Sequence, residues 1–232
     1  MSWRPELKVD VLYDDADMVV VNKQAGVYVH PSPGHEKGAL SDELVKMFPE
    51  MGDVGSRERP GVVHRLDAET SGVMVFAKTR QAYLKLREMF ETHNKVRKTY
   101  LAVLHGAPNP SQGTLETLIG RKPWDAKRMA VDVPDGKRAV THWTVLDKRG
   151  GLALVEFVIE TGRMHQIRVH AAHLGHPVVG DSLYGNAAKD RQLKSRPRRQ
   201  LLHAVQLEFQ HPASGKAMCF AAPPPADIVY AV

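Results

Sequence analysis

One carboxylate, Asp67, and one guanidinium, Arg65, stand two residues apart in a short polar loop. Apolar runs flank this loop, Val62–Val63 before it and Val73–Phe76 after it, and their residue types favour strands. A carboxylate between two strands is held by the scaffold while it stays open to a ligand, which favours an enzyme with a single acidic catalyst. An Asx-turn, in which the Asp67 side chain bonds the backbone near Thr70, explains the same spacing.

A second segment, Thr161–His170, offers a charge partner for that carboxylate. In a helix, Arg168 shares a side with Met164 and Ala171 and therefore lies near the apolar face. A partly buried arginine needs an anionic partner, because an unpaired buried charge is costly. If the partner is Asp67, the ion pair keeps the carboxylate ionised and oriented, as a nucleophile requires.

A third candidate, Tyr100, lies in the run Thr99–Leu104, which is apolar on both faces and predicts a central strand. In such a strand a tyrosine is by default a core residue whose hydroxyl has a hydrogen-bond partner. Arg65 is likewise by default a solvated or ion-paired surface residue. The residue types alone therefore leave a structural reading open for both.

Four histidines crowd one region and raise the question of a metal: His165, His170, His173 and His176. Zinc hydrolases carry a tight two-ligand signature with a placed carboxylate, such as H-E-x-x-H, and this sequence has none. Capping, loop contacts and RNA contacts explain the histidines equally well. We therefore expect no metal site.

The composition is that of an ordinary soluble globular protein, with 232 residues of which 43% are hydrophobic and 25% charged. The N-terminus lacks the apolar stretch of a signal peptide, and no apolar run approaches the ~18 residues of a membrane span. The single cysteine, Cys219, excludes an internal disulfide and suits a reducing compartment. We expect a cytoplasmic protein that does not bind membranes.

The net charge of +6 is concentrated in two stretches. The stretch from Lys78 to Lys98 contains seven basic residues and only two acidic ones, Glu88 and Glu91. The stretch from Lys189 to Arg199 contains six basic residues and a single aspartate. A basic stripe beside a reactive carboxylate attracts a polyanion, and nucleic acid is the first candidate.

Hydrophobic periodicity predicts many strands and a few helices of uneven length, which is typical of an α+β domain. Helices are expected over Ser41–Met47, Thr79–His93 and Met164–Leu174, and a basic loop over Ala187–Arg199. Besides Thr99–Leu104, strands are expected over Leu7–Leu12, Met18–Asn22, Val27–His30, Ala139–Leu146, Leu152–Ile159, Leu201–Phe209 and Ala217–Ala221.

Several co-ordered motifs give the chain a strong resemblance to the RluA-type family of pseudouridine synthases, from about Val11 to Pro224. The motifs are His64-Arg-Leu-Asp-Ala-Glu-Thr-Ser-Gly72, Arg97-Lys-Thr-Tyr-Leu-Ala102, Thr161–His170 with His173–Gly185, and Arg199–Ala204 with His211-Pro212. Two positions depart from the family pattern, Gln24 where a proline is common and Met164 where a small polar or basic residue is frequent.

The resemblance implies a function for individual residues. Asp67 matches the catalytic aspartate, Arg168 the arginine that pairs with it, and Tyr100 the tyrosine that stacks on the target uracil. Arg65 matches the side chain that fills the space left by the flipped nucleotide. Three further residues in the same motifs are expected to contact the substrate: Lys98, His165 and Gln166.

The resemblance also implies the fold, a mixed and mostly antiparallel sheet with flanking helices and a central RNA-binding cleft. We expect residues 1–232 to form a single catalytic domain without an N-terminal S4 domain, acting as a monomer. The stretches Lys127–Val131 and Ala139–His142 favour the family members that modify large-subunit ribosomal RNA over those that modify tRNA.

The implied reaction converts uridine to pseudouridine and involves no redox change, so we expect no cofactor. One carboxylate suffices, because the detached uracil is retained and no water enters, whereas hydrolytic glycosidases generally use two. Asp67 either attacks C1′ or assists loss of the C2′ proton. Two other functions stay open: a nucleic-acid N-glycosidase that hydrolyses the base off, and a non-catalytic RNA-binding or folding factor.

Overall fold

A computed structural model describes residues 7–93, 95–229 and 231. The chain divides into two compact units, each of which is described by itself. The first unit comprises Met1–Val96 and Gln206–Ala222, and the second comprises Arg97–Val205 and Pro223–Val232. The polypeptide therefore crosses between units at 96/97, within the strand that spans 202–210, and at 222/223.

The first unit is built on strands β1 (Asp10–Asp14), β2 (Met18–Lys23) and β5 (Ser71–Ala77), which pair in this order and antiparallel. Strand β12 (Ala217–Ala221) pairs antiparallel with Gln206–Gln210 of β11 (Leu202–Gln210). The remaining elements are α1 (Leu40–Met47), the 3-10 helix η1 (Pro49–Asp53), the two-residue strands β3 (Gly55–Ser56) and β4 (Arg59–Pro60), and α2 (Arg80–Thr92).

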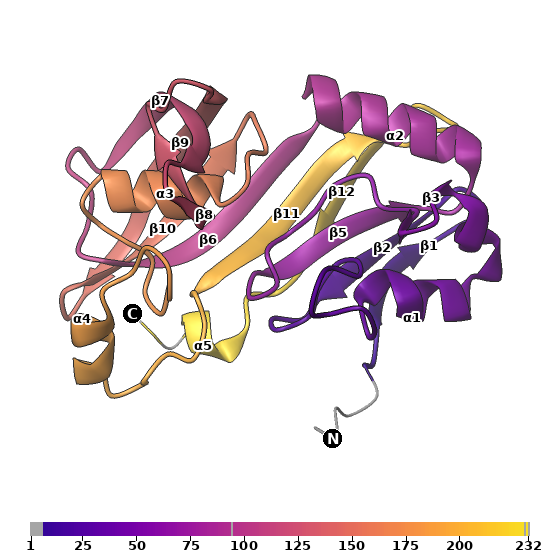
Figure 1. Ribbon diagram of the computed structural model, residues 1–232. Helices are drawn as coiled ribbons and strands as arrows, with labels where there is room; N and C mark the ends of the chain where they lie inside the picture. The colour runs from indigo at the N-terminus through magenta and orange to yellow at the C-terminus, as the bar shows by residue number, and fades with distance from the viewer. Residues whose placement is uncertain (1–6, 94, 230, 232) are drawn as a thin grey trace. The chain divides into compact units, whose positions relative to one another are not determined.

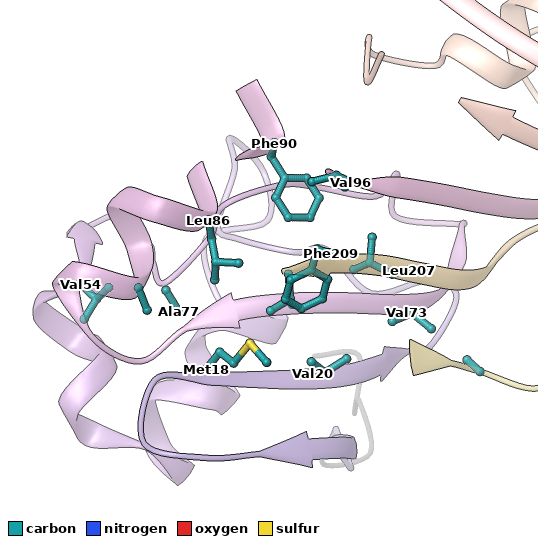
Figure 2. Close-up of a cluster of buried hydrophobic side chains, with 13 residues drawn as sticks. Met18, Val20, Val54, Val73, Ala77, Leu86, Phe90, Val96, Leu207 and Phe209 are labelled. Atoms are coloured by element: carbon teal, nitrogen blue, oxygen red, sulfur yellow. The ribbon is translucent and has the colours of Figure 1, made fainter. Parts of the chain in front are cut away.

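Helix α2 packs on β5 and closes the core of this unit (Figure 2). The Thr79 hydroxyl accepts a hydrogen bond from the Ala82 N–H, which caps the first turn at the predicted position. Ala82, Leu86 and Phe90, each four residues apart, are the buried face of the helix. They pack with Met18 and other residues of β2, β5 and β11 in one apolar cluster. The helix predicted over Thr79–His93 is confirmed.

The second unit contains β6 (Arg97–His105), β10 (Leu152–Ile159), β9 (Lys137–Arg149), β7 (Gln112–Lys122) and β8 (Asp125–Val131), which pair antiparallel in this order (Figure 1). Its helices are α3 (Gln166–His173), α4 (Ala187–Gln192) and α5 (Ala226–Val229). Helix α3 packs on β8 and β9, and Val169 joins Ile119 and Ala139 in a small buried cluster.

The predicted α+β class with a mostly antiparallel sheet is confirmed. The strand expected over Val27–His30 is wrong, because other groups use its carbonyls: the Lys23 ammonium binds that of Val27, and the N–H groups of Leu40 and Ser41 bind those of Tyr28 and Val29. The expected central cleft and single domain stay predictions. No helix in the described ranges has the length and apolar character to cross a bilayer.

Candidate active site

Gly61 fixes the entry to the loop that carries Asp67. Its φ of +68° is left-handed, and an added Cβ would lie 2.5 Å from the Ala77 carbonyl oxygen, so only glycine fits. The Gly61 N–H donates to the Val54 carbonyl at 2.7 Å, and its own carbonyl accepts from the Ala77 N–H at 2.9 Å. The chain therefore leaves this point in a fixed direction.

His64 attaches the same loop to the strand and helix beside it. Its Nε2 accepts a hydrogen bond from the Val75 N–H of β5 at 3.1 Å. Its ring stacks on Phe90 of α2, with ring centroids 4.3 Å apart and planes inclined by 9°. The histidine of the central motif thus has a structural task in positioning the residues that follow it.

Lys23 holds the far side of the loop from inside the protein. This lysine is 1% exposed, and its ammonium donates to the carbonyls of Ala68, Val27 and Gln24 at 2.7, 2.8 and 2.9 Å. Three carbonyls match the three donors of an ammonium group. The Ala68 carbonyl also accepts from the Gly26 N–H at 2.9 Å, so the residue directly after Asp67 has two anchors.

Asp67 itself is half-buried, and the preceding Arg65 is exposed. The Asp67 carbonyl accepts the Thr70 N–H at 3.1 Å, so its main chain closes the turn. Leu66 is buried between Arg65 and Asp67 and ties this piece of chain to the interior. The first unit therefore presents the carboxylate from a backbone that is fixed on both sides.

In the second unit, Tyr100 and Lys98 lie on β6 opposite Phe157 and Ile159 of β10. Residues two apart in a strand point to the same face, so Tyr100 and Lys98 share one face of β6. Both are buried, and the central strand predicted over Thr99–Leu104 is confirmed.

Gln166 begins helix α3, and its amide is fully used inside the protein. Its NH₂ donates to the Val140 carbonyl and the Thr141 hydroxyl, both at 2.9 Å. Its carbonyl oxygen accepts from the Thr161 hydroxyl at 2.8 Å and the Arg163 N–H at 3.0 Å. These four bonds exhaust the capacity of an amide. These contacts give Gln166 a structural task in holding α3, and the substrate contact expected from the sequence stays a prediction.

His170 continues this attachment one turn further along α3. It is fully buried, with Nε2 at 2.9 Å from the Thr117 hydroxyl and Nδ1 at 2.8 Å from the Thr141 hydroxyl. Burial, together with the nearby His173, lowers the pKa of His170 to about 4, so the ring is neutral at physiological pH. Gln166 and His170 lie four residues apart and bind α3 to β7 and β9.

Arg168 forms a bidentate ion pair with Asp181. Its Nε and Nη2 donate to Oδ2 and Oδ1 at 2.7 and 2.8 Å, and the two residues are 5% and 3% exposed. Burial raises the pKa of the Asp181 carboxyl, but hydrogen bonds and charge from Arg168 outweigh it and hold that pKa below its ordinary value. The Asp181 Oδ1 also accepts the N–H groups of Leu183 and Tyr184. Arg168 is therefore buried as expected, with a partner that sequence reasoning missed.

Tyr184 covers the other side of this ion pair. Its ring centre lies 5.2 Å from the Arg168 Cζ, which is cation–π geometry. Its hydroxyl accepts the Met129 N–H at 2.7 Å and bonds Nδ1 of the half-buried His165 at 2.8 Å. Asp181 and Tyr184 both lie in the motif segment His173–Gly185, so a charged and an aromatic residue there were the available signal. Asp67 belongs to the first unit and Arg168 to the second, so their pairing stays a prediction.

In the described part of the chain, one cluster has metal-ligand spacing: Asp15, Asp17 and His211. His211 Nδ1 accepts the N–H groups of Ala213 and Ser214, so its proton is on Nε2, which donates to Asp15 at 2.8 Å. The Asp15 Oδ1 accepts the N–H of Asp17 at 2.8 Å. The cluster thus ties two turns together by hydrogen bonds.

The family described as RNA pseudouridylate synthase matches residues 17–173. An uncharacterized RNA pseudouridine synthase of Chloroflexus aurantiacus is 47% identical over 207 residues, 89% of this chain and 63% of that protein. Ribosomal large subunit pseudouridine synthase D of Neisseria meningitidis serogroup A is 42% identical over 237 residues, 99% of this chain and 62% of that protein.

Among solved structures, human RNA pseudouridylate synthase domain containing 1 matches with a TM-score of 0.76 and 29% identity, covering 97% of this chain and 87% of that chain. The chain spans a little under two thirds of the length of these two bacterial relatives. The family match and these identities lead to one conclusion: the chain belongs to the RNA pseudouridylate synthase family.

Proposed function

We propose that this chain isomerises uridine to pseudouridine in RNA, with Asp67 as the catalytic residue. Family membership supports the reaction, and one observation of the structure supports the residue. The loop of Asp67 is anchored on both sides, by Gly61 and His64 before it and by Lys23 at Ala68 after it. A side chain that must meet C1′ of a flipped nucleotide needs such a fixed backbone.

The reaction breaks the N1–C1′ bond, turns the uracil over and joins C5 to C1′. Asp67 either attacks C1′ or assists loss of the C2′ proton. Tyr100 stacks on the uracil, and the exposed Arg65 enters the space that the flipped nucleotide leaves. Arg168, already oriented by Asp181, is the proposed charge partner of Asp67. His165 is half-buried and is the proposed substrate contact at the start of α3.

Two exposed features of the second unit support an RNA partner. Trp124, at the turn between β7 and β8, is 104% exposed, and the cations beside it in sequence are Arg121, Lys122, Lys127 and Arg128. An exposed aromatic ring among cations suits a nucleotide base next to phosphates. The second feature is the run of exposed basic residues Lys189, Arg191, Lys194, Arg196 and Arg198.

The surface between Lys78 and Lys98 contributes less charge than its sequence suggests. Lys78 is buried and pairs with Asp14 at 2.9 Å, and Lys98 is buried as well. The ammonium of Lys85 donates to the Pro212 carbonyl, and Arg87 pairs with Glu91. We therefore place the main phosphate contacts on the second unit.

Large-subunit ribosomal RNA is the proposed substrate, in preference to tRNA. The Neisseria relative is named for that substrate, and the match to it covers 99% of this chain. Mapping pseudouridines in ribosomal RNA and tRNA of a deletion strain would identify the modified uridine. A site lost only from tRNA would contradict the proposed substrate.

The activity is tested by tritium release from ribosomal RNA that contains [5-³H]uridine, combined with analysis for free uracil. We expect tritium release and pseudouridine without free uracil from the wild-type protein, and neither from Asp67→Asn. Free uracil with abasic sites would indicate an N-glycosidase instead. RNA binding without any change in the nucleosides would indicate a binding or folding factor.

A further inference from the structure

Lys98 is a buried cation without an anionic partner among the described residues. It is 6% exposed, and its ammonium makes one hydrogen bond, at 3.5 Å, to the Glu160 carbonyl. The two other buried lysines differ, since Lys23 has three carbonyls within 2.9 Å and Lys78 pairs with Asp14. A buried ammonium with unused donors is costly, so its presence calls for a ligand.

The surroundings of Lys98 add positive rather than negative charge. The Arg163 guanidinium is close enough to disfavour the Lys98 charge, and burial is the larger cause that lowers the Lys98 pKa to about 8. The carboxylate of Glu160, the residue whose carbonyl accepts the Lys98 hydrogen bond, is bound to His142 at 2.9 Å. At neutral pH Lys98 is therefore largely charged and ready to bind an anion.

The position of Lys98 connects two predicted parts of the site. It shares a face of β6 with Tyr100, the proposed stacking residue. A Cβ added to Gly162 would lie 3.8 Å from the Lys98 Nζ, so the ammonium lies close to the segment that leads into α3. An anion bound here would lie near Tyr100 and the start of the segment that carries Arg168.

We propose that the Lys98 ammonium binds a carbonyl oxygen of the target uracil and stabilises the negative charge on the detached base. This inference rests on the proposed function. When the N1–C1′ bond breaks, its electron pair stays on the base and spreads over N1, O2 and O4. The positive charge that is left on the sugar is neutralised either by a bond from Asp67 to C1′ or by loss of the C2′ proton. C5 then donates an electron pair to C1′, as the Asp67–C1′ bond breaks in the first route or as C2′ regains its proton in the second. C5 loses its proton, N1 gains one, and Lys98 transfers none.

A uracil oxygen fits this position better than a backbone phosphate. Phosphates lie on the outside of a folded RNA and meet exposed cations, whereas Lys98 is almost fully removed from solvent. A flipped base is flat, enters the protein and stacks on an aromatic ring. The charge on its oxygens also grows as the bond breaks, and interactions that strengthen in the transition state raise kcat.

The first test compares Lys98→Met with the wild type on tritium-labelled ribosomal RNA. Methionine keeps the length and removes the charge. We expect kcat to fall by roughly a hundredfold or more, as for other lost anion-stabilising donors, while KM changes little. We also expect the melting temperature to rise, since an unpaired buried charge is replaced by an apolar chain. The matched control is Lys194→Met, which replaces an exposed lysine. We expect this variant to change RNA affinity and its salt dependence.

The second test uses RNA that contains 5-fluorouridine, since fluorine withdraws electrons and stabilises the detached base by itself. The single-turnover loss of 5-fluorouridine is followed by mass spectrometry of digested RNA. We expect the defect of Lys98→Met to be at least several-fold smaller on this RNA than on normal RNA, because the base then needs less help.

Three results would overturn the Lys98 proposal: an unchanged kcat, an effect confined to RNA affinity with a weaker salt dependence, or equal defects on both bases. An effect confined to RNA affinity would indicate that Lys98 contacts a phosphate. Equal defects on both bases, together with a lower melting temperature, would indicate that Lys98 has a structural role. A wild-type protein that forms no pseudouridine overturns the proposed function instead, so the two failures are distinguishable.

Discussion

The guanidinium of Arg168 and the carboxylate of Asp181 form a buried, bidentate ion pair at 2.7 and 2.8 Å. This pair fixes Arg168, the proposed charge partner of Asp67, within the second unit. Gln166 and His170 hold the same helix to β7 and β9. Arg168 is thus oriented by contacts within the second unit.

Asp181→Asn should destabilise the protein by about 3 to 5 kcal/mol, because it leaves a buried arginine without its anion. The pKa of Asp181 is held below its ordinary value, so its stabilisation is present above the unfolded pKa and is lost as the pH falls through the folded pKa. Urea denaturation at pH 7 measures the loss. The matched control is Asp227→Asn, whose half-exposed ion pair with Arg199 should contribute only about 1 kcal/mol or less. Equal stability of the two variants would contradict the assignment.

Lys23→Met should cost about 2 to 4 kcal/mol and reduce turnover strongly, because three buried carbonyls lose their donor and the Ala68 anchor weakens. Thermal melting measures the loss of stability, and tritium release measures turnover. Hydrogen exchange of the loop after His64 shows whether the Ala68 anchor is weakened. The largely exposed Lys46→Met is the control and should melt like the wild type. A variant that folds normally and keeps full turnover would show that Lys23 does not position Asp67.

The stability difference between Lys98→Met and the wild type should depend on pH. Burial and Arg163 lower the folded pKa of Lys98 to about 8, below its unfolded value, so the charged lysine opposes folding below pH 8. The penalty is roughly 3 kcal/mol at pH 7, and it disappears as the pH rises toward the unfolded pKa. Urea denaturation at pH 7 and pH 10 should show a large advantage of the variant at pH 7 only. An equal difference at both pH values would contradict this charge state.

Trp124→Ala should weaken RNA binding by about 1 to 3 kcal/mol without a change in melting, because the ring is fully exposed and its proposed partner is a base. Binding at several salt concentrations should show an unchanged salt slope.

Replacing Lys194, Arg196 and Arg198 by glutamine should instead make the salt slope of RNA binding shallower, as fewer counterions are released. The same slope in the triple variant would exclude phosphate contacts by these residues.

Sequence reasoning succeeded where local pattern and packing agree. The helix predicted over Thr79–His93 matches α2, which Thr79 caps and whose buried residues Ala82, Leu86 and Phe90 repeat every four positions along the sequence. Strands β7 and β8 were missed because their apolar alternation is weak; much of β7 is solvent-exposed, and the described residues of β8 are mostly half-buried. Helix α4 was expected as a loop, but Asp190 fixes it through bonds to His105 and the Gly180 N–H, residues that are distant in sequence.

For the candidate site, the sequence predicted the chemistry-bearing residues but not what holds them. Arg168 was expected to be buried and paired, and it is, yet Asp181 could not be chosen as its partner without the fold. The network around Gln166 and His170 and the three-carbonyl contact of Lys23 join segments far apart in the chain. Such contacts depend on tertiary structure and leave no spacing pattern.

The most direct measurement is pseudouridine formation in ribosomal RNA by the wild type and Asp67→Asn, at equal concentration and with equal melting temperature. We predict stoichiometric release of tritium from C5 by the wild type and none above background by the variant, with RNA affinity retained. Pseudouridine formed by Asp67→Asn at the wild-type rate would contradict Asp67 as the catalytic residue.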